Sequence, residues 1–374
     1  MKILLFCIVL LGFSACHGNI KKDMSAEEDI KVAYVDSLLY GSSYLAGFQV
    51  LSFSSKNEDA LFIGVDKLLM ADNRMFIMDR LGNKVLAFDG EGNFISSTSR
   101  LIGDGPQNYI RVIDATVDND RKQIYIHCDA PYCIMIFDMD LNLIEKISLD
   151  FYMHEMVGDD NWLYGICHKE KGGQGYELVA LDKGNLKASP LVLLETNWMI
   201  PGVRGMGKSM TAYGDGINVC LPFDHTIYQI SDKEVIRSYS IDFGEKGLDR
   251  TKVENMSDRD FFDYIWWIKD IYGSDSNLVF GCNARETFVL DTQKAMCKGY
   301  ESTYMDMTLY STTNTFPVQG VDNAFAYVWK SMAIINFKEN ASEETLSKLS
   351  PEMKTLIQEY DEEDNPLIFL CKMK

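Results

Sequence analysis

Short runs of apolar residues, separated by polar turns, recur along the chain at a nearly constant interval. Each copy has a strand, a turn and a second strand that ends in a hydrophobic–aspartate pair or a variant of it. The copies are Met75 to Asp89, Ile124 to Asp138, Trp162 to Asp182, Ile217 to Ser231, Leu278 to Asp291 and Ala324 to Phe337. Their ends lie 44 to 60 residues apart. A period in this range, built of short strands alone, is typical of a β-propeller. We therefore predict an all-β fold, a six-bladed β-propeller with about four strands per blade.

The turns that follow the first two copies carry the residues that tight turns need. After the first copy, Asp89-Gly90-Glu91-Gly92-Asn93 lies between apolar residues. Glycine, aspartate and asparagine tolerate the positive φ angles of hairpin turns. A weaker version of the turn follows at Asp138-Met139-Asp140-Leu141-Asn142. The turn chemistry and the repeat period therefore agree.

One segment near the C-terminus has a helical period. Apolar residues recur there at steps of three and four positions between Ser342 and Tyr360. Ser342 is a weak helix cap, and Pro351 should divide the segment into two short helices. We expect a short helical insertion inside the last blade, followed by a final strand at 366–371.

Two segments are candidates for closing the ring of blades. Residues 50–53 would complete the first blade, whereas a strand near residues 32–35 would close the last one. The sequence pattern favours neither.

The first sixteen residues indicate export. A positive start is followed by an apolar run from Ile3 to Phe13, which is too short to span a bilayer but suits a signal peptide. The ending Phe13-Ser14-Ala15-Cys16 resembles a bacterial lipobox, so that Cys16 would become the lipidated first residue. The alternative is ordinary cleavage near Ala15, which leaves Cys16 a plain thiol. We expect a lipoprotein signal peptide at 1–15, a lipid-anchored tether at 16–29 and the propeller at 30–374. The protein would then be held at the bacterial envelope, at the outer membrane, by lipid alone.

The charge balance narrows the range of partners. The chain has 55 acidic and 36 basic residues and a net charge of −19. Nucleic acid is not expected as a partner, because phosphate recognition needs clustered lysine and arginine. The negative charge would favour cationic partners or divalent ions, or it serves solubility alone.

The cysteines leave one question open. Cys128 and Cys133 flank a four-residue turn candidate and could face each other across a hairpin. A disulfide and two free thiols are both compatible with this spacing. Cys128, Cys167, Cys220 and Cys282 recur at the ends of first strands. Equivalent positions of different blades lie too far apart for one metal ion, so we expect packing residues there.

Several motifs together resemble a known family. They are the turn around Gly90, Gly103-Asp104-Gly105-Pro106-Gln107-Asn108-Tyr109, Asp224–Ile230, Ile241–Gly244 and Asp364–Ile368. They resemble the six-bladed β-propeller lipoproteins of Bacteroides-type bacteria over residues 30–374. The resemblance implies the fold but no catalytic residue set, because most members have no assigned activity. Gln107 and Asn108 replace the usual glycine and glutamate, which puts any carboxylate role of that loop in doubt.

The sequence contains weak formal matches to a nucleotide-binding pattern and to metal-binding loops. Residues 202–209 fit the phosphate-loop pattern, but the glycine-rich continuation favours a strand and turn where a phosphate loop needs a helix. We therefore expect no nucleotide. Asp118-Asn119-Asp120 and Asp159-Asp160-Asn161 resemble fragments of calcium loops without the full oxygen spacing. We expect no cofactor, and calcium has no support beyond these fragments.

Aromatic residues are the best candidates for ligand contact. The pattern at residues 264–268 predicts an innermost strand, with one tryptophan facing the blade core and its neighbour facing the channel or the opposite blade. Trp266 and Trp267 in this segment, and Tyr109 and Trp198 in loops, could stack on sugar rings. Packing between blades is the alternative for all four residues.

These patterns favour a binding or interaction module at the envelope, with a protein, glycan or peptide ligand at one propeller face. An envelope hydrolase or lyase is the alternative function. Two carboxylates and a histidine converging on one face would support it. A third alternative, a structural subunit of an envelope assembly, would show a broad apolar patch.

Overall fold

The computed structural model describes residues 29–169, 175–197, 208–249, 251, 260–273, 276–284, 286–304 and 315–374. In these residues the fold is all-β, with few helices. Each group of four successive strands forms an antiparallel meander, which we name after its first strand. The meanders are β3 (Lys67–Ala71), β4 (Arg74–Asp79), β5 (Lys84–Asp89) and β6 (Phe94–Ser97); β7 (Arg111–Asp118), β8 (Gln123–Asp129), β9 (Cys133–Phe137) and β10 (Leu143–Ser148); β11 (Met153–Gly158), β12 (Trp162–His168), β13 (Tyr176–Asp182) and β14 (Leu191–Glu195); β15 (Met210–Tyr213), β16 (Gly216–Val219), β17 (Thr226–Ser231) and β18 (Glu234–Asp242); and β19 (Ile268–Gly273), β20 (Asn277–Cys282), β21 (Thr287–Asp291) and β22 (Met296–Tyr304).

The last meander is completed by the N-terminal part of the chain. It contains β23 (Thr315–Gln319), β24 (Ala324–Trp329) and β25 (Leu367–Met373), and its outer strand is β2 (Leu45–Leu51). Leu51 pairs with Ile368 across more than 300 residues of sequence. Both closure alternatives are therefore wrong as stated. Residues 50–51 complete the last meander rather than the first, and 32–35 belong to β1.

Strand β1 (Ile30–Tyr40) lies outside the meanders and joins two of them. It pairs in parallel with β22 over most of its length and with the end of β18 through Ile30 and Lys31. A four-residue helix, α1 (Gly41–Tyr44), then connects β1 to β2. Residues 30–51 thus hold three meanders together from the rim.

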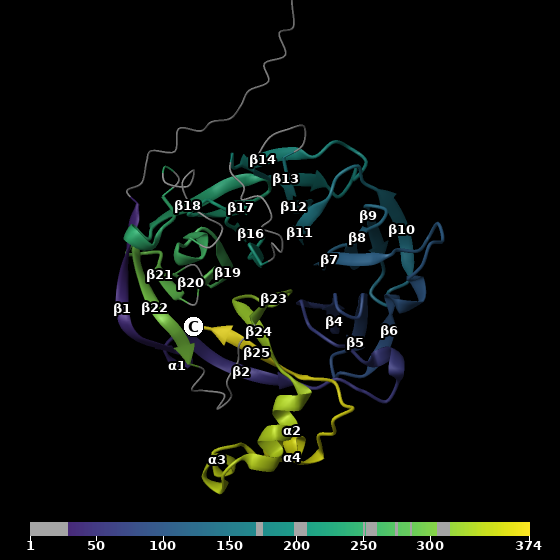
Figure 1. Ribbon diagram of the computed structural model, residues 1–374. Helices are drawn as coiled ribbons and strands as arrows, with labels where there is room; N and C mark the ends of the chain where they lie inside the picture. Colours follow the sequence, from purple (N-terminus) through teal and green to yellow (C-terminus); the bar gives the residue numbers. More distant parts are fainter. Residues whose placement is uncertain are drawn as a thin grey trace, which may run out of the picture.

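Figure 1 shows the meanders arranged as a ring, with the first strand of each nearest the centre. Consecutive first strands contact one another from β3 through β7, β11, β15 and β19 to β23, and β23 pairs in parallel with β3. Apolar residues of neighbouring meanders pack face to face between them, as where Phe76 and Phe137 share one buried cluster. This arrangement is propeller-like. The first strands surround a central axis, so that all of them begin near one end of the axis and finish near the other.

The helical segment is larger than the sequence pattern indicated. Helices α3 (Glu343–Ser347) and α4 (Pro351–Glu359) confirm the expected break at Pro351, and the Ser342 hydroxyl caps α3 by accepting a hydrogen bond of 3.2 Å from the Thr345 amide. The expected second strand ending at Phe337 is wrong. That residue lies in α2 (Ser331–Asn340), where its ring packs 5.3 Å from the ring of Trp329. Figure 1 shows these helices projecting from the rim of the ring.

The predicted turns form by side-chain hydrogen bonds to the backbone. The Asp89 carboxylate accepts bonds of 2.9 Å from the amides of Glu91 and Asn93, and Gly92 has a φ of 84°. Asp138 repeats this arrangement in the next meander. Four short 3₁₀ turns at Glu58–Ala60, Thr98–Leu101, Gly244–Lys246 and Asp260–Asp263 connect other elements.

Cys128 and Cys133 are directly paired residues of β8 and β9, as the hairpin prediction required. Both are buried, and both are free thiols. Cys167, Cys220 and Cys282 are likewise buried, and they lie in apolar clusters.

Candidate functional site

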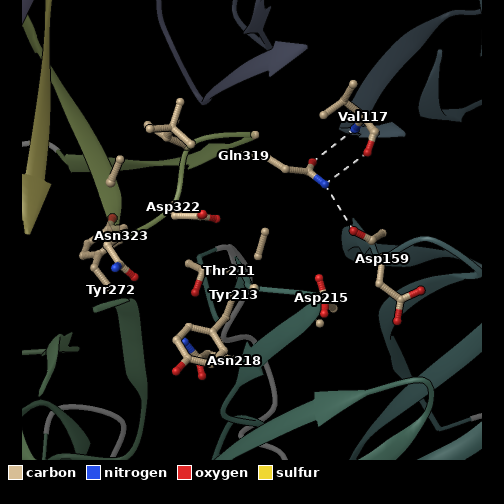
Figure 2. A pocket seen from close by; sticks show the side chains of 18 of the residues that line it. Val117, Asp159, Thr211, Tyr213, Asp215, Asn218, Tyr272, Gln319, Asp322 and Asn323 are labelled. Atoms are coloured by element: carbon tan, nitrogen blue, oxygen red, sulfur yellow. Dashed lines mark hydrogen bonds between the residues drawn. The ribbon is translucent and has the colours of Figure 1, made fainter. Parts of the chain in front are cut away.

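Two cavities mark the two ends of the axis, and they are lined by opposite ends of the first strands. One cavity, of about 350 Å³, lies where these strands begin and includes Lys67, Asp114 and Glu155; we call it the Glu155 cavity. The other, of about 200 Å³, lies where they end and is shown in Figure 2; we call it the acidic cavity. The two cavities share no lining residue.

Lys67 crosses the axis below the Glu155 cavity. Its Nζ lies 2.7 Å from Asp114 Oδ1 and donates hydrogen bonds to the carbonyl oxygens of Met156 at 2.7 Å and Ala115 at 3.3 Å. Asp114 Oδ2 in turn accepts a bond of 2.6 Å from the Met156 amide. The lysine of β3 is thus bound to β7 and β11, and its charge is neutralised where it is buried.

Gln319 makes a second set of contacts across the axis, nearer the acidic cavity. Its Oε1 accepts bonds from Thr116 Oγ1 at 2.7 Å and the Val117 amide at 3.1 Å. Its Nε2 donates to the carbonyl oxygens of Val117 at 3.2 Å and Gly158 at 3.1 Å. Figure 2 shows this side chain reaching from β23 to β7. With Lys67, it fills the axis between the two cavities, so the Glu155 cavity is a pocket with a floor.

Glu155 is a buried carboxyl group in this pocket. Its two oxygens accept bonds of 2.7 and 3.0 Å from the Ser209 amide, and Oε2 accepts one of 3.0 Å from the Met210 amide. Burial, followed by the nearby Asp114 carboxylate, raises the pKa of Glu155 to about 8, against the opposing effects of Lys67 and the amide donors. A pKa this high favours the protonated form of Glu155 at neutral pH.

Three further cations face the Glu155 cavity: Arg80, Lys208 and Lys269. The two lysines share one carboxylate, since each Nζ lies 3.9 Å from an oxygen of Asp270. Lys208 also donates to the Thr315 carbonyl oxygen. Burial raises the pKa of the Asp270 carboxyl group, which weakens its ability to balance two lysines.

His154 borders the same cavity as a neutral imidazole. Its ring packs 4.3 Å from the ring of His168 and 4.9 Å from that of Tyr152. Burial, then the neighbouring His168 and His127, lowers the pKa of His154 to about 4. Its buried Nε2 has no hydrogen-bond partner among the described residues.

The predicted aromatic residues divide between packing and the cavity. Trp267 lines the Glu155 cavity, and its Nε1 donates a bond of 2.7 Å to Ser209 Oγ. Trp266 is 4% exposed and stacks on Phe223 at 5.1 Å. The tryptophans precede innermost strand β19 rather than lying within it, and they divide between core and channel as expected.

Tyr109 is placed in the core and not on an open face. It is 1% exposed, and its hydroxyl group lies 2.8 Å from Thr98 Oγ1 and donates to the Asn83 carbonyl oxygen at 3.0 Å. Of the two alternatives given for this loop residue, burial favours packing over ligand contact, because the hydroxyl group finds these partners inside the meander. Trp198 and Cys16 lie outside the described residues.

The acidic cavity gathers the two segments that resemble calcium-loop fragments. Asp118 is held by Lys183 at 2.7 Å and Arg121 at 2.9 Å, and Asp159 accepts bonds from the Asn161 and Trp162 amides. Their oxygens are thus already engaged. Within the described ranges, no group of three or more histidine, cysteine, aspartate or glutamate side chains is placed to hold a metal ion.

Acidic residues nonetheless gather at this end of the axis. Burial and the carboxylates of Asp120, Asp159 and Asp215 raise the pKa of Asp160. Asp215 and Asp322 both line this cavity, as Figure 2 shows. The two ends of the axis therefore differ in charge.

The phosphate-loop match has a strand where the nucleotide-binding motif needs a helix. Lys208 and Ser209 lead directly into β15, and the residues before them lie outside the described ranges. Lys208 instead lines the Glu155 cavity.

In the part of the chain that the structure describes, no helix is long and apolar enough to cross a membrane.

The sequence analysis missed most residues of the Glu155 cavity. A signal for them exists, because Lys67, Asp114, Glu155 and Lys269 each stand 7 to 10 residues before the first strand of a predicted repeat. Polar residues at that common position would all lie at one end of the axis. Which of them touch cannot be read from the interval.

Comparisons with known proteins agree with this architecture. The family described as "Domain of unknown function (DUF4934)" matches residues 56–372, so the chain belongs to that family. A Bacteroides fragilis protein that is named as exported has a similar structure, with a TM-score of 0.70, 16% identity, and coverage of 93% of this chain and 100% of that one. Likeness to BamB from Moraxella catarrhalis is weaker, with a TM-score of 0.42, 10% identity, and coverage of 76% and 75%. No curated protein matches the chain.

Proposed function

We propose that this member of the DUF4934 family is an exported, lipid-anchored, six-bladed β-propeller that binds its ligand in the Glu155 cavity at the cell envelope. The meanders named after β3, β7, β11, β15, β19 and β23 would be the six blades. Export is supported by the apolar N-terminal run and by the likeness to an exported Bacteroides protein. The proposed boundaries are residues 1–15 for the signal peptide, 16–29 for the tether and 30–374 for the propeller.

The observation that carries the binding role is the floored pocket. Its volume of about 350 Å³ suits a small ligand or one unit of a larger one. Its walls come from several meanders, and Lys67 and Gln319 lock the strands beneath it. A rigid frame with converging polar groups and one aromatic wall is the usual form of a binding site.

Ligand screening with a matched pair of variants tests this role. The mature lipidated protein is challenged with glycans and peptides, and any binding is repeated with Trp267→Leu and Trp162→Leu. Trp162 is the control because it is also half-buried and lies beneath a lysine, Lys233, 4.6 Å from its ring, but it does not line the Glu155 cavity. We expect the Trp267 variant alone to lose affinity, by about tenfold. Equal loss in both variants, or in neither, contradicts the assignment.

The anchor is tested separately with Cys16→Ala. If Cys16 carries lipid, labelling with a radioactive fatty acid and membrane fractionation should both lose their signal in this variant. Continued membrane association without label would leave ordinary cleavage near Ala15 as the explanation.

An envelope hydrolase or lyase is the second candidate function, and one observation favours it. The Glu155 cavity brings together the carboxyl groups of Asp114 and Glu155 with the His154 imidazole. A carboxyl group protonated at neutral pH is suited to general acid catalysis. If the protein turns over a bound ligand, Glu155→Gln should abolish turnover while binding persists. Unchanged turnover would exclude Glu155 as the acid.

A further inference from the structure

We propose that the ligand is an acidic oligosaccharide, which lies along a groove formed by the Glu155 cavity and a neighbouring cavity. This inference rests on the proposed binding function and gives it a ligand class. The second cavity, also of about 350 Å³, includes Arg80, Arg111 and Tyr152. It shares Asp66, Arg80 and Ile113 with the Glu155 cavity. We call the continuous depression the Arg80 groove. Its two parts can accommodate more than one sugar unit.

Positive charge lines the Arg80 groove although the protein as a whole has a net charge of −19. Lys208 and Lys269 stand at one end, Arg80 in the middle and Arg111 at the other end. Arg80 is exposed, and its guanidinium group has no hydrogen-bond partner among the described residues. Lys208 and Lys269 share a single carboxylate at 3.9 Å, so both can bind an additional anion.

Most carboxyl groups along the groove are already engaged with other partners. Asp114 is paired with Lys67 at 2.7 Å, and Asp129 outside the groove is paired with Arg111. Asp66 accepts a bond of 3.0 Å from the Arg80 amide, and burial raises its pKa. Glu155 is buried, and its raised pKa favours the protonated form at neutral pH. Arg80, Lys208 and Lys269 lie along the groove with no ion pair closer than 3.9 Å among the described residues, and a ligand with several carboxylates could pair with all three.

Two aromatic side chains favour sugar rings over a peptide. Trp267 lines the end of the groove beside Lys269, and its orientation is set by the hydrogen bond to Ser209. Tyr152 lines the other end, where its ring packs 5.5 Å from that of Tyr132. Aromatic surfaces next to cations offer a sugar ring an apolar wall and its carboxylate a partner. A uronic acid combines these two needs in one unit.

Binding of matched sugars tests the ligand class. Oligosaccharides of galacturonic and glucuronic acid are compared, by calorimetry on the mature protein, with the same oligosaccharides after reduction of their carboxyl groups. Poly-glutamate serves as the acidic peptide. We expect binding of one acidic oligosaccharide, with an affinity at least about tenfold above that of its reduced form.

Two charge variants locate the site. Arg80→Gln and Lys269→Gln should each weaken binding of the acidic sugar about tenfold. Lys233→Gln, which removes the lysine beside Trp162 instead, should leave it unchanged.

The outcomes separate this inference from the proposed function. Equal binding of acidic and reduced sugars, or binding of poly-glutamate alone, overturns the acidic oligosaccharide, as does failure of every acidic sugar to bind. The pocket itself stands if any ligand loses affinity in Trp267→Leu but not in Trp162→Leu. If every bound ligand is insensitive to Trp267→Leu, the proposed function falls as well.

Discussion

Thr116 Oγ1 donates a hydrogen bond of 2.7 Å to Gln319 Oε1 and accepts one of 2.9 Å from the Gly158 amide. These contacts join β23, β7 and β11 at the axis. Thr116 and Gln319 are 203 positions apart in sequence. The backbone amides and carbonyl oxygens of Val117 and Gly158 thereby gain hydrogen-bond partners at the axis. The ring is therefore held at its centre by polar contacts and between meanders by apolar packing.

Gln319→Leu should destabilise the protein. It leaves the Val117 amide and the carbonyl oxygens of Val117 and Gly158 without this partner, at a cost of about 2 kcal/mol or more. Urea unfolding measures the change. Gln293→Leu, at an exposed turn position, is the control and should change the free energy of unfolding by less than about 0.5 kcal/mol. Equal midpoints for both variants would show that the axial contacts add no stability.

Lys67→Met should be more costly. It leaves Asp114 buried without its cation, and loss of one partner of a buried pair typically costs about 3–5 kcal/mol. Lys122→Met is the control, because its pair with Asp72 at 3.1 Å is exposed and should be worth less than about 1 kcal/mol. Guanidinium unfolding compares the two variants. A Lys67 variant as stable as the Lys122 variant would contradict the importance of the buried pair.

Glu155 should make stability depend on pH. The folded state holds its proton up to a pKa of about 8, whereas the ordinary value is 4.5. Between these values the folded state binds more protons than the unfolded state, so the free energy of unfolding falls as the pH rises. The contribution is fully present below pH 4.5 and lost above about pH 8. The slope within this window approaches about 1.4 kcal/mol per pH unit.

Glu155→Gln removes this titration and keeps the shape of the side chain. We expect the stability of the natural protein, relative to this variant, to decline from about pH 5 to about pH 9. Chemical unfolding of both proteins across that range measures the difference. Parallel curves would show that Glu155 is ionised in the folded protein at neutral pH.

Cys128 and Cys133 should be modified only after unfolding. Both are buried, which keeps the reagent away from both sulfur atoms. Burial also raises the pKa of Cys128 and suppresses its reactive thiolate form, whereas the contact with Cys128 lowers the pKa of Cys133. Alkylation with iodoacetamide before and after denaturation, followed by mass spectrometry, should label the two thiols only in the denatured protein. A denatured protein that remains unlabelled at both positions until it is reduced would show a disulfide instead.

The local elements could be predicted because they depend on neighbouring residues. A short apolar run and the turn chemistry at Asp89 specify β5, β6 and their hairpin within a few positions of each other. The break at Pro351 is equally local, since proline lacks the amide that a continuous helix needs. The strand predicted to end at Phe337 was wrong, because an apolar residue between two short patterns is compatible with either a helix or a strand. In the structure Phe337 belongs to helix α2 and packs on Trp329.

The all-β class, the repeat and most hairpins could be read from the sequence, because they follow from short apolar runs and turn chemistry over a few residues. The strand that completes the last meander was set by the tertiary structure, since β2 and β25 meet across nearly the whole chain. The tertiary structure alone decided the burial of Tyr109 and the composition of the Glu155 cavity. Each wall of that cavity comes from a different meander, and its contacts arise only when the ring closes.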